Sequence, residues 1–153
     1  KERGPNRLTE NMLDLYAGVG TFGIWLASKV LGVYCVEIGD IASQDMAFNM
    51  AENRVTNLGI SRSTVTSFLK RFRGNAKILL VDPPRTGMDP EVRKAIVKLS
   101  PPLILYVSCH PSTLARDLAD LHAAGGYEID SVQIFDQFGR THHIESLAIL
   151  RRV

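Results

Sequence analysis

Residues Leu13–Gly23 have the sequence LDLYAGVGTFG, in which the glycine pattern GxGxxG begins at Gly18. The segment Met12–Tyr16 (MLDLY) is a strand candidate, and Thr21–Val30 has the apolar spacing of a helix. Glycines between a strand and a helix let the backbone approach a ligand at the N-terminal end of that helix. The stretch therefore predicts an α/β fold that binds a nucleoside-containing cofactor at its first strand–helix turn.

The rest of the chain continues this alternation of short apolar runs and helical patterns. Further strands are expected at Gly32–Glu37, Arg62–Thr66, Lys77–Asp82, Leu103–Ser108, Tyr127–Phe135 and Ile144–Arg151. Further helices are expected at Asp40–Asn53, from Asp89-Pro90-Glu91 through Leu99, and from Pro111 to Gly125-Gly126. Strands that alternate with helices form right-handed crossovers and a parallel sheet.

The connection between the last two strands is polar and leaves no room for a helix, so the last strand should run antiparallel to the others. A parallel sheet closed by one antiparallel strand resembles the Rossmann-like, class I methyltransferases. We therefore expect a seven-stranded sheet of order 3-2-1-4-5-7-6, with helices on both faces. Residues 1–153 should form one domain, because the length is that of a single ordinary domain, and the resemblance implies that this domain is catalytic.

Bulk composition narrows the class of protein. The chain is 45% hydrophobic and 22% charged with a net charge of +2, which is typical of a globular domain and does not demand an anionic partner. No apolar run reaches the length of a membrane span, and the start KERGPNRLTE has no apolar signal-peptide core. We expect a cytoplasmic protein, and the missing initiator methionine suggests a piece of a longer chain.

Three acidic residues narrow the identity of the expected cofactor. Glu37 ends the second strand, where its carboxylate can accept from two ribose hydroxyls. Asp14 lies inside the first strand, where strands that bind NAD are usually apolar, and Asp82 begins the sequence DPPR after the fourth strand. A carboxylate at this ligand-binding edge favours S-adenosylmethionine over NAD, and no metal site is predicted.

Two side chains from distant parts of the sequence should meet at the same edge. Cys109, in the stretch YVSCHP (106–111), follows the fifth strand and precedes a helix whose positive end favours a thiolate. Glu145 begins the last strand, which runs backward beside the fifth. Cys35 lies inside a strand, where an inert core role is expected, and two intervening strands place it too far from Cys109 for a disulfide.

A thiol and a carboxylate in one cleft suggest a reaction with a nucleophilic step followed by a proton abstraction. The C5 carbon of a pyrimidine requires both steps, because it becomes nucleophilic only after a thiolate has added to C6. A base must then remove the C5 proton before the enzyme is released.

Four ordered stretches, LDLYAGVGTF, VDPPRTGMD, YVSCHPSTLARDL and FDQFGRTHHIE, resemble the RNA uracil-5 methyltransferase family over nearly the whole chain. The resemblance implies that the chain methylates a uridine of tRNA or rRNA, with Cys109 as nucleophile and Glu145 as base. The residues implied for S-adenosylmethionine are Tyr16, Thr21, Glu37 and Asp82, beside Gly18 and Gly20 of the glycine pattern. The residues implied for the substrate side are Arg85, His110 and His143.

The chain departs from the family in places. His110 replaces the usual asparagine after the cysteine, and Gly139 replaces a usual proline. Family members also carry upstream domains that bind cofactor and RNA, so this chain alone should bind RNA poorly.

Four alternatives stay open. A cytosine-5 methyltransferase would have a second cysteine near Pro84 and Arg85, and an amino-group methyltransferase would have an aromatic residue after the two prolines. An NAD-binding module would prefer NADH in a titration. A truncated domain would bind cofactor weakly and catalyse nothing.

Overall fold

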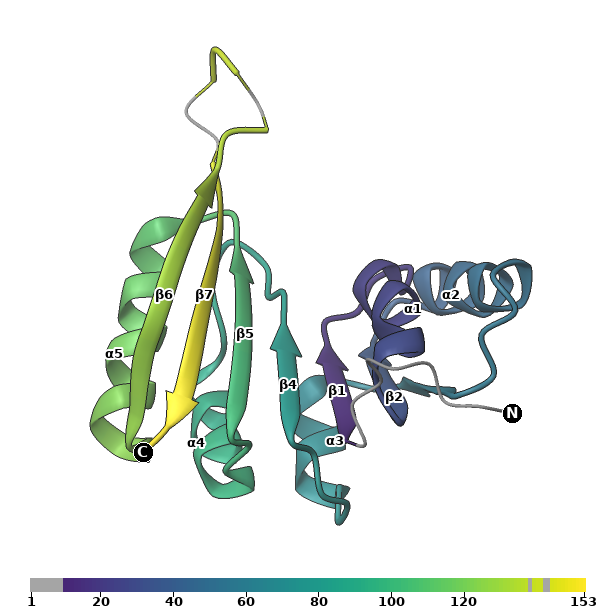
Figure 1. The fold of residues 1–153 in the computed structure, drawn as a ribbon, viewed down its shortest axis with the longest axis horizontal. Helices are drawn as coiled ribbons and strands as arrows, with labels where there is room; N and C mark the ends of the chain where they lie inside the picture. Colours follow the sequence, from purple (N-terminus) through teal and green to yellow (C-terminus); the bar gives the residue numbers. More distant parts are fainter. Residues whose placement is uncertain (1–9, 138, 142–143) are drawn as a thin grey trace.

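The computed structural model describes residues 10–137, 139–141 and 144–153, which build a sheet with helices on both faces (Figure 1). The strands are β1 Asn11–Leu15, β2 Gly32–Glu37, β3 Leu58–Arg62, β4 Ile78–Val81, β5 Leu103–Ser108, β6 Tyr127–Phe135 and β7 Glu145–Arg152. The helices are α1 Thr21–Leu26, a 3₁₀ turn η1 Ala27–Lys29, α2 Asp40–Glu52, α3 Val65–Arg71, α4 Pro90–Leu99 and α5 Pro111–Gly125.

The sheet order is β3-β2-β1-β4-β5-β7-β6, as predicted. Strands β1 to β5 pair in parallel, whereas β7 pairs antiparallel with both β5 and β6. The start of β7 therefore lies beside the end of β5, and Ser146 pairs with Ser108. This register brings a segment from late in the sequence to the carboxyl edge of the parallel strands.

Alternate strand residues face two separate apolar layers. On one face Leu13 and Leu15 of β1 pack with residues of α3, α4 and α5, and on the other Met12 packs with residues of α1, η1 and α2. Figure 1 shows α4 and α5 behind β5, β7 and β6, and α1 and α2 beside β1 and β2. Burial of both strand faces is what a central parallel strand requires.

The third strand is the one element whose expected place is wrong. It runs from Leu58 to Arg62, whereas Arg62–Thr66 was expected, and the helix α3 that follows was not predicted. Thr64 caps this helix, because its hydroxyl accepts from the backbone N–H of Ser67 at 3.1 Å. The capping residue thus ends the strand segment earlier than the apolar pattern indicated.

Three helix details also differ from the sequence pattern. Helix α1 ends at Leu26 and continues only as the 3₁₀ turn, and Trp25, which has the spacing of a buried position, is 73% exposed. Pro90 begins α4 as expected, but the side chain of the N-cap residue Asp89 makes no capping hydrogen bond. The apolar face of α4 is buried at Val92 and Ile96.

The outermost strand β6 carries an irregularity. Its pairing with β7 shifts between Ile129 and Ser131, which leaves Asp130 as an extra residue in the strand. The side chains of Ile129, Val132 and Ile134 are about half exposed or more.

Candidate active site

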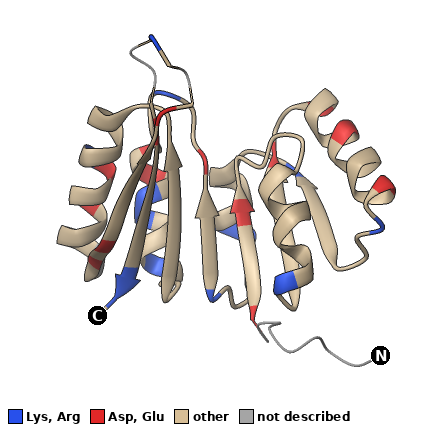
Figure 2. Cartoon of the chain, turned by 45° about the horizontal axis from the view of Figure 1, so that its top comes forward, with Lys and Arg blue, Asp and Glu red and all other residues tan. Residues whose placement is uncertain are grey.

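The carboxyl edge of the sheet holds a cavity of about 480 Å³. Cys109 enters it from the end of β5, Asp82 from the end of β4 and Glu145 from the start of β7. The cavity is lined by Phe22, Asp82, Val107, Cys109, Phe135, Gln137, Glu145, Ser146 and Leu147. The thiol and the carboxylate that sequence analysis expected in one pocket therefore share one cavity. Figure 2 shows acidic segments at this edge as well as on the helices.

The electrostatics of this cavity are set by its two carboxyl groups. Partial burial, and next the negative charge of Glu145, raise the pKa of Asp82 to about 6. Neither lysine nor arginine is among the described residues that line the cavity. A site with two carboxylates and no cation favours a positively charged ligand, since such a ligand relieves their mutual repulsion.

The thiol of Cys109 is half buried and free, at the start of helix α5. His110 is the N-cap residue of this helix, and the hydroxyl of Ser108 accepts from the His110 backbone N–H at 3.0 Å. The thiol thus lies directly before the N-terminal end of a 15-residue helix. Cys35, by contrast, is a fully buried free thiol, as expected for a core residue.

A second cavity, of about 210 Å³, lies at the carboxyl ends of β2 and β3. It is lined by Tyr16, Val36, Glu37, Ile38, Ser63, Thr64, Val65, Thr66 and Asp89. Tyr16 and Glu37 were candidates from the sequence, whereas Ser63 and Thr64 were not. They were missed because the third strand was placed too late, although threonine, the residue at position 64, is a typical N-cap residue type.

Glu37 fastens the glycine loop to the second strand. Its Oε2 accepts from the backbone N–H of Gly18 at 2.9 Å, and its Oε1 accepts from Gly39 at 2.7 Å. Carboxylate oxygens have further lone pairs, so Glu37 can still accept from a ligand. Gly20 has φ +85°, and a Cβ there would lie 2.6 Å from the Met46 Cγ atom, so the loop requires glycine at this position.

Two other residues of this loop region have distinct settings. Tyr16 adopts a left-handed φ of 64° at the end of β1, and burial raises the pKa of its phenol to about 12. Thr21 is the first residue of α1 and is exposed. Both lie at the edge where the sequence placed the cofactor.

Asp14 lies in β1, before the glycine loop, and lines neither of the two cavities. It is fully buried, the backbone N–H of Gly23 donates to its carboxylate, and the Cys35 Sγ lies 3.8 Å from its Oδ2. Its Oδ1 has no hydrogen-bond partner among the described residues. Burial raises the pKa of Asp14 to about 7.

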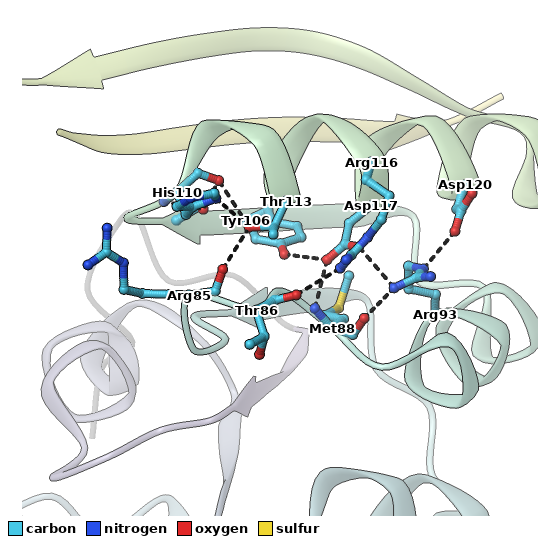
Figure 3. A network of polar contacts seen from close by, with 11 residues as sticks. Arg85, Thr86, Met88, Arg93, Tyr106, His110, Thr113, Arg116, Asp117 and Asp120 are labelled. Atoms are coloured by element: carbon cyan, nitrogen blue, oxygen red, sulfur yellow. Dashed lines mark hydrogen bonds and ion pairs between the residues drawn. The ribbon is translucent and has the colours of Figure 1, made fainter. Parts of the chain in front are cut away.

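The loop between Asp82 and Asp89 is clamped by one side of α5 (Figure 3). The Thr113 hydroxyl donates to the carbonyl of Arg85 at 3.1 Å, and the Arg116 guanidinium donates to the carbonyl of Thr86 at 2.9 Å. Because α5 starts directly after Cys109, these bonds fix the position of the loop relative to the thiol.

The centre of the clamp is Asp117, which is fully buried. Its Oδ2 accepts from the Met88 backbone N–H and from the Tyr106 hydroxyl, each at 2.7 Å. Its Oδ1 accepts from Arg93 at 2.9 Å and from Arg116 at 2.8 Å. Sequence analysis did not single out this residue, because the spacing shows only that it lies in a helix.

The three candidates for the substrate side have different settings. Arg85 is exposed in the clamped loop, and Figure 3 shows its guanidinium pointing away from the Asp117 network. The His110 Nδ1 lies 3.4 Å from the Thr113 hydroxyl. His143 lies outside the described residues.

Comparison with known proteins places this arrangement in a family. Residues 4–153 match the family model described as tRNA (Uracil-5-)-methyltransferase. The chain belongs to the tRNA (uracil-5-)-methyltransferase family. The resemblance recognised from the four sequence motifs is thereby confirmed.

Curated relatives of this family member are longer than the chain. An uncharacterized RNA methyltransferase of Thermotoga maritima is 43% identical over 141 residues, which are 92% of this chain and 32% of the relative. One from Thermosynechococcus vestitus is 40% identical over 92% of the chain and 31% of its own length. The chain thus spans about a third of the length of these relatives.

A solved structure supports the same family. The crystal structure of Pyrococcus abyssi tRNA (uracil-54, C5)-methyltransferase in complex with S-adenosyl-L-homocysteine has a TM-score of 0.83 at 33% identity. The match covers 95% of this chain and 35% of that one. A precorrin-6y C5,15-methyltransferase from Geobacter metallireducens, at 13% identity and a TM-score of 0.80, shares the fold alone.

None of the helices in the described part of this family member is long and apolar enough to cross a bilayer.

Proposed function

We propose that this chain is the catalytic part of an RNA methyltransferase that methylates C5 of a uridine in tRNA or rRNA. The observation that carries the proposal is the shared cavity of Cys109, Glu145 and Asp82 at the meeting point of β4, β5 and β7. Family membership supports the substrate class, since the matching family is named for transfer to uracil C5 of tRNA. A thiol and a separate carboxylate are the two groups that this reaction requires.

The residues present fit S-adenosylmethionine. Glu37 and Tyr16 line the smaller cavity, whose polar side chains suit a nucleoside, and the Gly18 backbone N–H donates to Glu37 at 2.9 Å, which holds the glycine loop beside that residue. Two carboxylates without a cation suit a sulfonium better than the anionic diphosphate of NAD. When bound, S-adenosylmethionine supplies an electrophilic methyl group.

In the proposed mechanism Cys109 acts first. Its sulfur bonds to C6 of the uracil, and the C5–C6 π electrons move toward O4, which makes C5 nucleophilic toward the methyl group. Glu145 then accepts the proton from the methylated C5. The double bond re-forms as the sulfur leaves C6 as a thiolate, so the enzyme is regenerated.

The proposal is tested with the natural full-length protein and RNA that contains 5-fluorouridine. Fluorine cannot leave C5 as a proton, so the reaction stops at a covalent protein–RNA complex that survives denaturing electrophoresis. Cys109→Ala should abolish this complex, whereas Cys35→Ala, which removes the buried core thiol, should retain it. A complex that persists in Cys109→Ala would remove Cys109 as the nucleophile.

The base role is tested with ordinary RNA. Glu145→Gln should accumulate the covalent methylated adduct and slow turnover at least about 100-fold, as expected for loss of a general base. Glu128→Gln, on the exposed strand β6, should leave turnover unchanged. Mass spectrometry of nucleosides from tRNA and rRNA, after reaction with labelled cofactor, identifies the modified base and the RNA class.

A further inference from the structure

A groove of about 480 Å³ lies between α3 and the strands β2 and β3, away from both cavities described above. It is lined by Asn11, Tyr34, Ser61, Phe68, Arg71, Phe72, Arg73, Gly74 and Asn75. It shares no lining residue with the cavity of Cys109 or with that of Glu37. Asn11 begins β1, so the groove reaches toward the amino ends of the strands, opposite to the candidate active site.

Three aromatic rings form one wall of this groove. Phe68 lies in α3 and Phe72 directly follows this helix, and their rings stack with 5.2 Å between the ring centres. The ring of Tyr34, on β2, contacts Phe72 edge-on with 6.2 Å between the ring centres. Tyr34 is 47% exposed, so part of this aromatic surface faces solvent. Exposed aromatic rings provide stacking surfaces for nucleobases, and such stacking tolerates any sequence.

The other wall is cationic. Arg71, the last residue of α3, and Arg73 line the groove, and neither has a carboxylate partner in the described part of the chain. Lys70, which lies outside the lining, pairs with Glu91 at 3.0 Å. The Arg73 guanidinium donates to the carbonyls of Lys70 and Phe72, which holds it beside the rings. The described residues of the lining include neither aspartate nor glutamate.

We propose that this groove binds a single-stranded segment of the substrate RNA, outside the target uridine. Phosphates would neutralise Arg71 and Arg73, and bases would stack on the exposed ring of Tyr34. The inference deepens the proposed function and depends on it, because the ligand is the same RNA. Phe68 and Phe72 also pack against the core, but the exposed ring of Tyr34 beside two arginines that have no carboxylate partner among the described residues leaves a surface suited to a base and a phosphate.

The inference is tested by fluorescence anisotropy of a fluorescein-labelled 15-nucleotide uridine RNA with the natural full-length protein at several salt concentrations. Arg71→Ala/Arg73→Ala should weaken binding about tenfold and lower the slope of log K against log[salt] by about 1 to 2. Arg152→Ala, which removes an exposed cation at the far edge of the sheet, should change neither quantity.

Stacking gives an independent readout. Tyr34→Leu keeps an apolar side chain on β2 and should weaken RNA binding several-fold with an unchanged salt slope. If the double arginine variant and Tyr34→Leu both bind RNA within twofold of the wild type, the inference is overturned. Unchanged RNA binding with an altered sedimentation coefficient would also overturn it and would assign the groove to a protein contact.

Methyl transfer separates this inference from the proposed function. If the wild type methylates RNA and the groove variants do so with unchanged KM, only the groove assignment fails. If the wild type binds RNA but methylates none, the proposed reaction fails. RNA binding that depends on Arg71, Arg73 and Tyr34 would in that case still support the groove.

Discussion

Asp14 and Asp117 are both fully buried carboxylates, yet their surroundings are opposite. Asp117 accepts from two guanidinium groups, a phenol and a backbone N–H, whereas Asp14 accepts from a backbone N–H and lies near a thiol. One Asp14 oxygen has no partner among the described residues, and the pKa of Asp14 is raised to about 7. Two carboxylates that are equally buried therefore differ in how many hydrogen-bond donors surround them.

The two carboxylates also serve different loops. Asp117 holds the loop that leads from Asp82 to Met88, through charged bonds that need the ionised form. Asp14 accepts a hydrogen bond from the backbone N–H of Gly23, and a protonated carboxyl group or an amide oxygen can accept the same bond. The loop near Cys109 is therefore held by a carboxylate with two guanidinium partners, whereas the glycine loop is held by hydrogen bonds from backbone N–H groups to Asp14 and Glu37.

The largest expected effect is that of Asp117→Asn. Loss of the charge leaves Arg93 and Arg116 without their shared carboxylate, and breaking a buried pair costs about 3 to 5 kcal/mol. For a chain of this length that lowers the melting temperature by roughly 10 °C, measured by circular dichroism.

The matched control is Asp120→Asn. Asp120 also pairs with Arg93, at 2.8 Å, but its side chain is 53% exposed. Loss of the Asp120 charge should lower the free energy of unfolding by less than about 1 kcal/mol. Equal losses for the two variants would refute the contrast between a central and a peripheral partner of Arg93.

A smaller effect, of opposite sign, is expected for Asp14→Asn. A raised carboxyl pKa means that the folded state holds its proton more tightly, so Asp14 lowers stability as the pH rises from about 4 to 7. Removing the charge should therefore make the variant more stable than the wild type at pH 8, by on the order of 2 kcal/mol, with no gain at pH 4. Urea unfolding at both pH values measures the difference, and a gain independent of pH would contradict it.

The smallest expected effect concerns the pH profile of activity. Because the pKa of Asp82 is about 6, this carboxyl becomes negative above pH 6, where it can attract a sulfonium. Methyl transfer should rise with pH through about 6, and Asp82→Asn should remove this rise and increase the KM for S-adenosylmethionine about tenfold. Asp45→Asn, an exposed change on α2, should keep the wild-type profile; a retained rise in Asp82→Asn would assign it to another group.

The sequence predicts most of this fold because each central strand is a short apolar run between helical patterns. It also brings Cys109 and Glu145 together, since an antiparallel last strand must begin where the fifth strand ends. The third strand was misplaced because LGISR contains a glycine and two polar residues, a weak pattern for an edge strand.

The Asp117 clamp lies beyond sequence reasoning for a different reason. Its partners Met88 and Arg93 precede it by 29 and 24 residues and belong to other elements. No local pattern indicates which helix face will meet which loop. The sequence singled out Asp14 because it lies inside the first strand. The structure shows that its carboxylate accepts a hydrogen bond from the Gly23 backbone instead of lining either cavity.

The extra residue in β6 has a consequence for how these molecules behave at high concentration. A regular outer strand with exposed Ile129, Val132 and Ile134 would be a template on which another copy could add its own strand. The bulge at Asp130 breaks the even spacing of outward-facing amides, so a continuous ladder can form only along Ser131–Phe135. Deleting this residue would straighten the strand and promote aggregation through intermolecular β-sheet.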